Sequence, residues 1–118
     1  MSQLGIREGS ARAARYEDGF RVLQGKREYV TYLDDSSIRI WYSDVPWRYE
    51  PHDHSAVEVL LTTEGMVTYT VEDTVYQVRK GEVLIVPPDT IHSLSMEAGS
   101  SRYLFLFEPD VVMTMRDI

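Results

Sequence analysis

Cysteine is absent from the 118-residue sequence, which excludes a disulfide framework and a thiol nucleophile. Long hydrophobic runs are missing as well, because no apolar stretch approaches the roughly 20 residues that cross a bilayer. The N-terminus also lacks the continuous hydrophobic segment of a secretory signal. These absences lead us to expect a cytoplasmic protein with no membrane partner.

Positive charge is scarce outside the N-terminus. The net charge is −7, and residues 1–27 hold six basic side chains against three acidic ones, a local balance of +3 that leaves −10 on the remaining 91 residues. A body this acidic repels a phosphate backbone, so we expect no direct nucleic-acid binding by this chain. The basic stretch is either an arm for an anionic partner or a solvated leader, and the solvated leader is the more frequent case.

Helical periodicity is lacking over most of the chain, whereas runs rich in Val, Ile, Tyr, Thr and Leu recur from about residue 28. The predicted strands are Tyr29–Leu33, Ile38–Tyr42, Val57–Thr63, Val67–Val71, Val75–Val78, Val83–Val86, Ile91–Met96 and Arg102–Phe107. Eight short strands with close turns predict an all-β sandwich or barrel. We expect an N-terminal arm over 1–27, a barrel over 28–108 and the start of a helix over 109–118, with Asp110 near its N-cap.

The sequence contains only three histidines, and their positions are informative. On a strand, residues two apart share a face, so His52 and His54 can converge, and Glu58 follows at an even offset. His92 comes after a Pro-Pro-Asp turn that can bring the next strand alongside. Three imidazoles and a carboxylate suit one divalent transition metal ion, namely Zn, Fe, Mn, Co or Ni, with open positions for water or ligand if the ion is six-coordinate. A lone His-x-His pair, by contrast, is usually a solvated loop.

The residues around the histidines form a longer pattern: His52-x-His54-x3-Glu58-x6-Gly65, then Gly81-x5-Pro87-x4-His92. From about residue 46 to residue 96, this pattern closely resembles the two signature motifs of the cupin superfamily. The resemblance implies a jelly-roll barrel, also called a double-stranded β-helix, in which the three histidines and Glu58 are metal ligands. It also allows a cupin that keeps these residues but works without a metal. Departures from the family pattern occur at three non-ligand positions: Pro46, Asp89 and Met96. Both motif glycines follow a charged residue at a strand end, where we expect positive φ.

A second resemblance covers Ser37 to Val112. The stretch Val-Leu-Leu-Thr-Thr-Glu-Gly after Glu58, the run from Tyr76 to His92 and the exit from Tyr103–Phe107 into Glu-Pro-Asp are similar to the effector-binding domain of AraC-type transcription regulators. The resemblance implies a small-molecule effector, often a sugar, and a homodimer. It also implies an N-terminal arm that closes over the ligand, and DNA binding by a downstream domain. The chain is then either an excised sensor domain or a stand-alone relative.

The competing hypothesis is a stand-alone metal-dependent cupin enzyme, a dioxygenase or a sugar isomerase. An enzyme needs a second acid or base near the metal, and the sequence marks none clearly, because its carboxylates fall mainly in turns. We therefore favour a sensor, with a sugar or an organic acid as effector.

Three side chains are candidates for the effector pocket. Trp47 and Tyr69 adjoin the motif strands, and Arg102 on the closing strand carries a guanidinium that suits a hydroxyl-rich or anionic ligand. Trp41 and Tyr49 are expected in the core, because a small barrel needs large side chains to fill it. The early predicted strands Tyr29–Leu33 and Ile38–Tyr42 lie near the sheet margin and are the candidate dimer surface.

Overall fold

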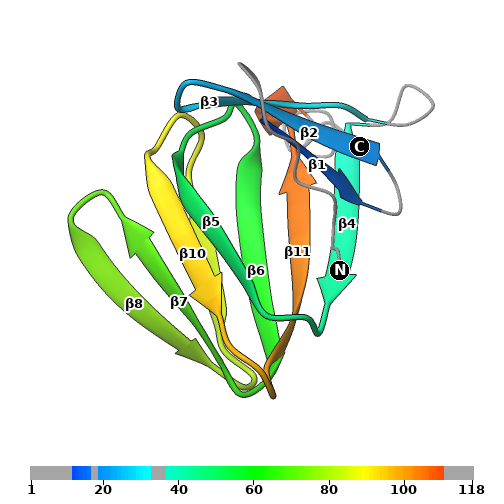
Figure 1. Ribbon diagram of the computed structural model, residues 1–118. Coiled ribbons are helices and arrows are strands. Elements are labelled where there is room, and N and C mark those ends of the chain that lie inside the picture. Colours follow the sequence, from blue (N-terminus) through cyan, green and yellow to red (C-terminus); the bar gives the residue numbers. More distant parts are fainter. Residues whose placement is uncertain (1–11, 17–18, 33–36, 111–118) are drawn as a thin grey trace, which may run out of the picture.

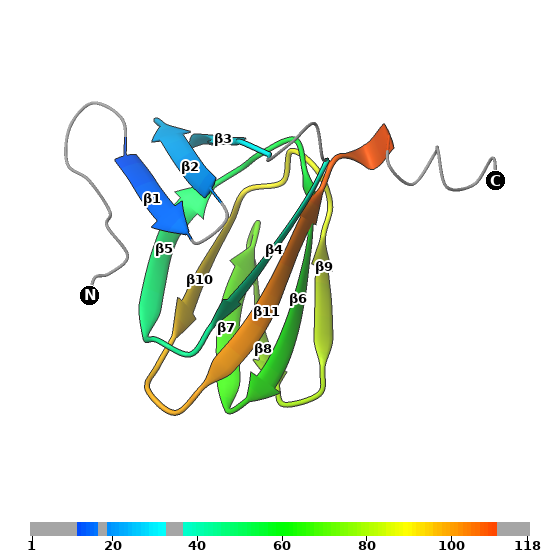
Figure 2. The same cartoon turned by 90° about the vertical axis from the view of Figure 1, so that its right-hand side faces the viewer.

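The computed structural model describes residues 12–16, 19–32 and 37–110. Within these ranges the chain forms strands β1 (Arg12–Tyr16), β2 (Gly19–Gln24), β3 (Arg27–Val30), β4 (Ile38–Ser43), β5 (Trp47–His52), β6 (Val57–Glu64), β7 (Met66–Val71), β8 (Thr74–Arg79), β9 (Val83–Val86), β10 (His92–Met96) and β11 (Ser101–Phe107). Two four-stranded antiparallel sheets, ordered β5-β10-β7-β8 and β4-β11-β6-β9, make the barrel. A third sheet, β1-β2-β3, lies across one end of it (Figures 1 and 2). The predicted all-β jelly-roll fold is confirmed.

Period-two alternation decides which side chains enter the barrel. Along β6, Glu58, Leu60 and Thr62 are buried, while the residues between them are only partly covered. The same alternation on β11 buries Leu104 and Leu106. The buried apolar side chains of both sheets form one core, composed of Trp41, Tyr49, Ala56, Leu60, Val67, Tyr69, Val78, Val86, Leu94, Met96, Leu104 and Leu106.

The structure differs from the sequence prediction in three places. Strand β5 was not predicted, because Pro51 and outward-facing charged residues hide its alternation; β5 is an edge strand, where a proline is tolerated. Strands β1 and β2 lie where only an arm was expected. Strands β9 and β10 belong to different sheets, although they are consecutive in the chain. Of the predicted helix over 109–118, residues 111–118 lie outside the described residues, and the division into arm, barrel and helix stays a prediction.

The sheet β1-β2-β3 is joined to the barrel by backbone hydrogen bonds. A parallel bridge pairs Arg27 with Asp53 in the loop after β5. The amide of Glu28 donates to the carbonyl of Asp53, and the amide of Asp53 donates to the carbonyl of Lys26, both at 2.7 Å. These bonds place the start of β3 directly beside the connection between β5 and β6.

Gly65 turns the chain from β6 into β7 at a point where a side chain has no room. Its φ is +67°, and a Cβ there would lie 2.3 Å from Ser100 Oγ and 2.9 Å from Ser100 Cα. Gly81 has a φ of +83°, but a Cβ there would meet nothing within 4 Å. The expectation of positive φ at both glycines is confirmed, and only Gly65 also has a steric reason to be glycine.

The two glycines therefore give a matched pair of variants. Gly81→Ala should lower the free energy of unfolding by about 1 kcal/mol, because alanine must adopt positive φ. Gly65→Ala should cost about 1–3 kcal/mol more, because Ser100 and its backbone must also move. Urea denaturation of both variants and the parent measures the difference. Equal losses would contradict the close approach of Ser100 to the turn.

Candidate metal centre

A β-bulge turns His52 into the barrel. In the pairing of β10 with β5, His92 lies opposite His52 and Leu94 lies opposite Tyr49, so three steps on β5 match two on β10. Tyr49 is buried, and strict alternation from it would point His52 outward. The extra residue, in the segment that contains Pro51, shifts the alternation by one, and His52 is fully buried. Bulges often re-aim a side chain beside a functional site in this way.

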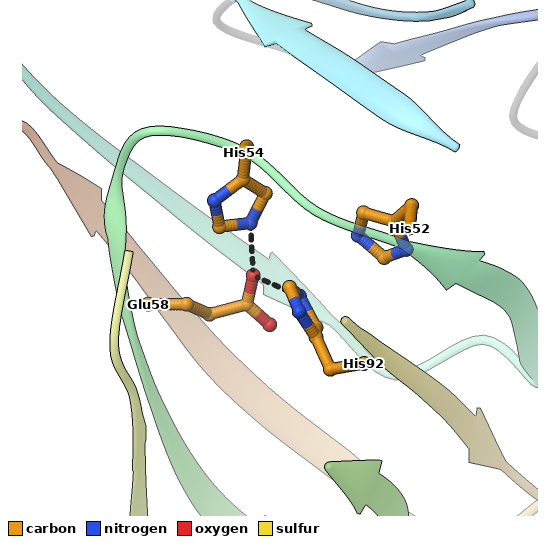
Figure 3. Close-up of side chains that lie close together, drawn as sticks. All are labelled: His52, His54, Glu58 and His92. Carbon is orange, nitrogen blue, oxygen red and sulfur yellow. Dashed lines mark hydrogen bonds and ion pairs between the residues drawn. The ribbon is translucent and has the colours of Figure 1, made fainter. Parts of the chain in front are cut away.

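The other three predicted ligands reach the same place from different elements (Figure 3). His54 lies in the loop between β5 and β6, Glu58 points inward from β6, and His92 opens β10. The prediction that one regular strand aligns residues 52–58 is thus wrong in its geometry, because β5 ends at His52 and β6 begins at Val57. The convergence itself is confirmed: ligand atoms of the three histidines and Glu58 all lie within 4.8 Å of one another.

Each imidazole is fixed through its Nδ1 atom. That nitrogen lies 2.8 Å from the Glu50 carbonyl for His52, 3.0 Å from the Ala56 carbonyl for His54 and 2.8 Å from the Thr90 carbonyl for His92. A carbonyl only accepts, so each Nδ1 carries the proton and donates. The Nε2 atoms are left for the interior, which is the ring orientation that metal-ligating histidines have when a backbone carbonyl holds the outer nitrogen.

Glu58 is the buried acid at the centre of the group. Its Oε1 lies 2.9 Å from His54 Nε2 and 3.2 Å from His92 Nε2, and Tyr69 donates its hydroxyl to Oε2 at 2.5 Å. Burial alone would raise the pKa of Glu58. The charge of His92 and the hydrogen bonds from His54 and His92 outweigh burial and hold the pKa of Glu58 well below its usual value. The site therefore favours an ionised carboxylate.

This donor set fits a divalent metal ion. Two donors bound side by side to one ion at about 2.0–2.2 Å lie about 3 Å apart, close to the two separations at Glu58. Because Nδ1 carries a proton, Nε2 can donate a hydrogen bond to Glu58 only if the ring is doubly protonated and therefore charged. If the rings are neutral, their Nε2 lone pairs are available to bind a cation instead. Three nitrogens and one oxygen suit zinc, iron, manganese, cobalt or nickel. When bound, such an ion would hold and polarise an oxygen atom of a small molecule at an open position.

The three predicted pocket residues have different positions. Tyr69 is buried in the site and contacts Glu58. Trp47 begins β5, five residues before His52. On β11, Leu106 is the residue that pairs with Glu58 on β6. Arg102 lies four residues before Leu106 on the same strand, which is about 13 Å away. Trp47 and Arg102 are thus at the far end of the barrel, and their part in effector binding stays a prediction.

Sequence analysis missed Glu28, which β3 brings to the site. Glu28 is 1% exposed and accepts a hydrogen bond from the hydroxyl of Tyr49. Its Oε1 lies 3.8 Å from His52 Nε2 and 3.9 Å from His54 Nε2. One signal was present: Glu28 shares a strand face with Val30, which packs against the core. An apolar neighbour two residues on indicates that this face points inward.

Comparison with known proteins agrees with the barrel fold. Among solved structures, the chain is similar to a cupin superfamily protein from Desulfitobacterium hafniense, at 16% identity and a TM-score of 0.53 over 67% of this chain and 73% of that one. It is similar to an RmlC-like cupin from Shewanella frigidimarina, at 15% identity and a TM-score of 0.53 over 91% and 85%.

A third similar structure is salicylate 1,2-dioxygenase from Pseudoaminobacter salicylatoxidans, at 16% identity and a TM-score of 0.54 over 67% of this chain and 23% of that one. No curated protein matches the sequence. Within the described residues, no helix has the length and apolar character needed to cross a membrane. The family model of the AraC-like ligand binding domain matches residues 38–117, and the chain belongs to that family.

Proposed function

We propose that this chain is a metal-dependent sensor domain, the effector-binding part of an AraC-type transcription regulator. The observation that carries the proposal is the buried group of three histidines and Glu58, oriented by backbone carbonyls inside a barrel of the AraC-like ligand binding family. The ion would supply open positions, and an oxygen-bearing effector would occupy them reversibly. DNA binding belongs to a separate domain, because residues 28–118 carry a net charge of −10.

A sugar or an organic acid is the effector class that this chemistry favours. Hydroxyl and carboxylate oxygens are good ligands for Zn, Mn, Fe or Ni when the protein supplies nitrogen and one carboxylate. Tyr69 stands beside the metal group and offers an aromatic ring, with its centroid 6.2 Å from that of His92 and nearly parallel to it. The effector would thus meet both the ion and an aromatic wall.

One observation favours an enzyme as the second candidate. Glu28 is a buried carboxylate beside two of the histidines, and it supplies the additional acidic group that the sequence did not reveal. An enzyme would use such a group to move a proton on a metal-bound substrate. The two candidates differ in one outcome, since a sensor returns its ligand unchanged.

Removing a ligand tests the metal. His92→Ala and His52→Ala should each abolish stoichiometric metal after loading with Zn²⁺, Ni²⁺, Mn²⁺ or Fe²⁺ and desalting, because each variant removes a nitrogen donor from a closed buried set. Elemental analysis provides the measurement, and Glu50→Gln, an exposed change on β5, is the control. If the parent protein retains none of these metals, the metal part of the proposal is wrong.

A thermal-shift screen tests the effector. A sugar, sugar acid or small aromatic acid at about 100 times its dissociation constant should stabilise the metal-loaded protein by about 2.7 kcal/mol, a rise of several degrees in Tm. Residues 1–27 should become more resistant to trypsin in its presence, because an arm that closes over the ligand gains further contacts in the bound state. Product analysis of every hit decides between the candidates: a ligand recovered intact supports the sensor, and a consumed or isomerised one establishes the enzyme.

The outer face of the sheet β4-β11-β6-β9 indicates a dimer. Apart from Thr63 at the end of β6, its outward residues are apolar on all four strands: Ile38, Ile40, Tyr42, Tyr103, Phe105, Phe107, Val57, Val59, Leu61, Val83 and Ile85. The register aligns them in rows across the sheet, such as Ile40, Phe105, Val59 and Ile85. By contrast, the outer face of β5-β10-β7 carries Arg48, Glu50, Ser93, Ser95, Thr68 and Thr70.

A second copy of this chain is the occupant we propose for the apolar face. Six of its side chains are 39–61% exposed. If each has a full surface of about 150–250 Å², their total exposed area is roughly 600 Å². That is the upper end of the largest apolar patch on a typical monomer and approaches the roughly 800 Å² that each partner gives to a stable interface. An uncharged sheet face can pair with itself about a two-fold axis. The proposed dimer surface thus includes the predicted strand Ile38–Tyr42 and extends across three further strands. It leaves out the other early strand, Tyr29–Leu33, whose first residues belong to β3 in the sheet β1-β2-β3.

A charge placed on this face should separate the dimer. Ile85→Lys introduces a lysine at a position that is 61% exposed in the single chain, and burying it against a second copy is unfavourable. Val75→Lys is the matched control, because Val75 is also 61% exposed but lies on β8 of the other sheet. Light scattering at tens of micromolar should give a dimer for the parent and for Val75→Lys and a monomer for Ile85→Lys. A monomeric parent would overturn the assembly.

A further inference from the structure

Two adjacent charged residues at the start of β3 lie on opposite sides of the rim of the barrel. Arg27 remains partly exposed, and its guanidinium lies 2.8 Å from Asp89 and 3.2 Å from Asp53. Glu28, next in the chain, is buried inside. Asp53 separates two of the histidine ligands, and Asp89 lies in the turn before the third. Although exposed ion pairs stabilise little, this arrangement fixes β3 against both loops that carry ligands.

The carboxylate of Glu28 is held with one oxygen toward the metal group. Tyr49 donates to Oε2, while Oε1 lies 3.8 and 3.9 Å from the Nε2 atoms of His52 and His54. Two donors on one ion at about 2.1 Å each are separated by about 3.0 Å when adjacent and about 4.2 Å when opposite. Both separations lie between these two values, so a movement of less than about 1 Å would bring Glu28 Oε1 to the adjacent-donor distance from each histidine.

Charge balance supports the same role. Glu28 and Glu58 are two buried carboxyl groups at one end of one barrel, surrounded by imidazoles whose Nδ1 protons are already donated. Buried carboxylates need a compensating charge: protonated imidazoles supply it when no metal is bound, and a divalent cation supplies +2 when the rings are neutral. Three neutral histidines and two carboxylates make a neutral site around such an ion.

Building on the metal binding proposed above, we propose that Glu28 is a fifth protein ligand, so that the ion joins the sheet β1-β2-β3 to the barrel. A six-coordinate ion then keeps one open position for an effector instead of two. The N-terminal sheet is coupled directly to metal occupancy, because the backbone bonds between Lys26, Glu28 and Asp53 hold β3 and the ligand loop as one unit.

Manganese binding to the whole chain tests this assignment. In the parent, water-proton relaxation should report one water on each bound Mn²⁺. Glu28→Gln should raise the relaxivity of bound Mn²⁺ roughly twofold by opening a second position, and should weaken the affinity about 10–100-fold. Glu50→Gln removes the same charge from an exposed position on β5 and should match the parent in both. Tyr49→Phe keeps the carboxylate and should retain the relaxivity of the parent.

The outcomes separate this inference from the proposed function. If the parent binds Mn²⁺ and Glu28→Gln has the relaxivity and affinity of the parent, Glu28 is not a ligand and the sensor proposal stands. If the parent binds none of the metals tested, both are wrong.

Hydrogen exchange of the parent decides the case in which Glu28→Gln does not fold. Zn²⁺ should slow the exchange of the amides of β3 at least about tenfold, because the ion then holds this strand closed. Exchange in β3 that is unchanged by Zn²⁺ would overturn the inference.

Discussion

The burial of one carboxylate, Glu58, constrains the rest of this structure. A buried charge is tolerated only with close compensating partners, and Glu58 has two imidazoles and the Tyr69 hydroxyl within 3.2 Å. To supply them, β10 must begin at His92 opposite His52, and β7 must present Tyr69 on the inner face. The bulge in β5 adds a third imidazole to the group, because without it His52 would face solvent. One of the two register shifts in the barrel thus lies at this site, and the other lies at Ser101 and Arg102, at the opposite end.

Much of the barrel could be predicted because sheet burial follows a period of two. The strands from Ile38 to Phe107, apart from β5, correspond to alternating runs bounded by turn residues. The alternation within each run also indicates which side chains point into the core. The identity of the four donor residues also followed from sequence, through the resemblance of the flanking spacing to a known pattern. Each strand and each of the two motifs is local, so a short stretch of chain contains the information needed to recognise it.

Other features could not be predicted because they depend on partners far apart in the chain. The bulge at Pro51 is defined by the register with β10, some 40 residues away. Regular alternation along one strand therefore predicted that the side chains converge, but not the bulge and loop that bring them together. In the sequence, Glu28 follows Arg27, and such a pair of charges is typical of an exposed position. Its burial becomes evident only when β3 is placed beside Asp53. The contrast between the two outer faces likewise needs the strand order, because each face combines residues from several strands.

The sequence separations within the site set the order in which it can form. His52, His54 and Glu58 are close to one another in the chain, on β5, the following loop and β6. His92 is separated from them by the strands β6, β7, β8 and β9, which must form before it can reach the group. The sequence separation is larger still in the second sheet, because the edge strand β4 pairs with β11, where Ile38 lies opposite Phe107. Such non-local pairing folds slowly compared with local hairpins. During synthesis, the three histidines and Glu58 therefore cannot come together until most of the barrel has left the ribosome, so this group forms at the end of folding rather than at its beginning.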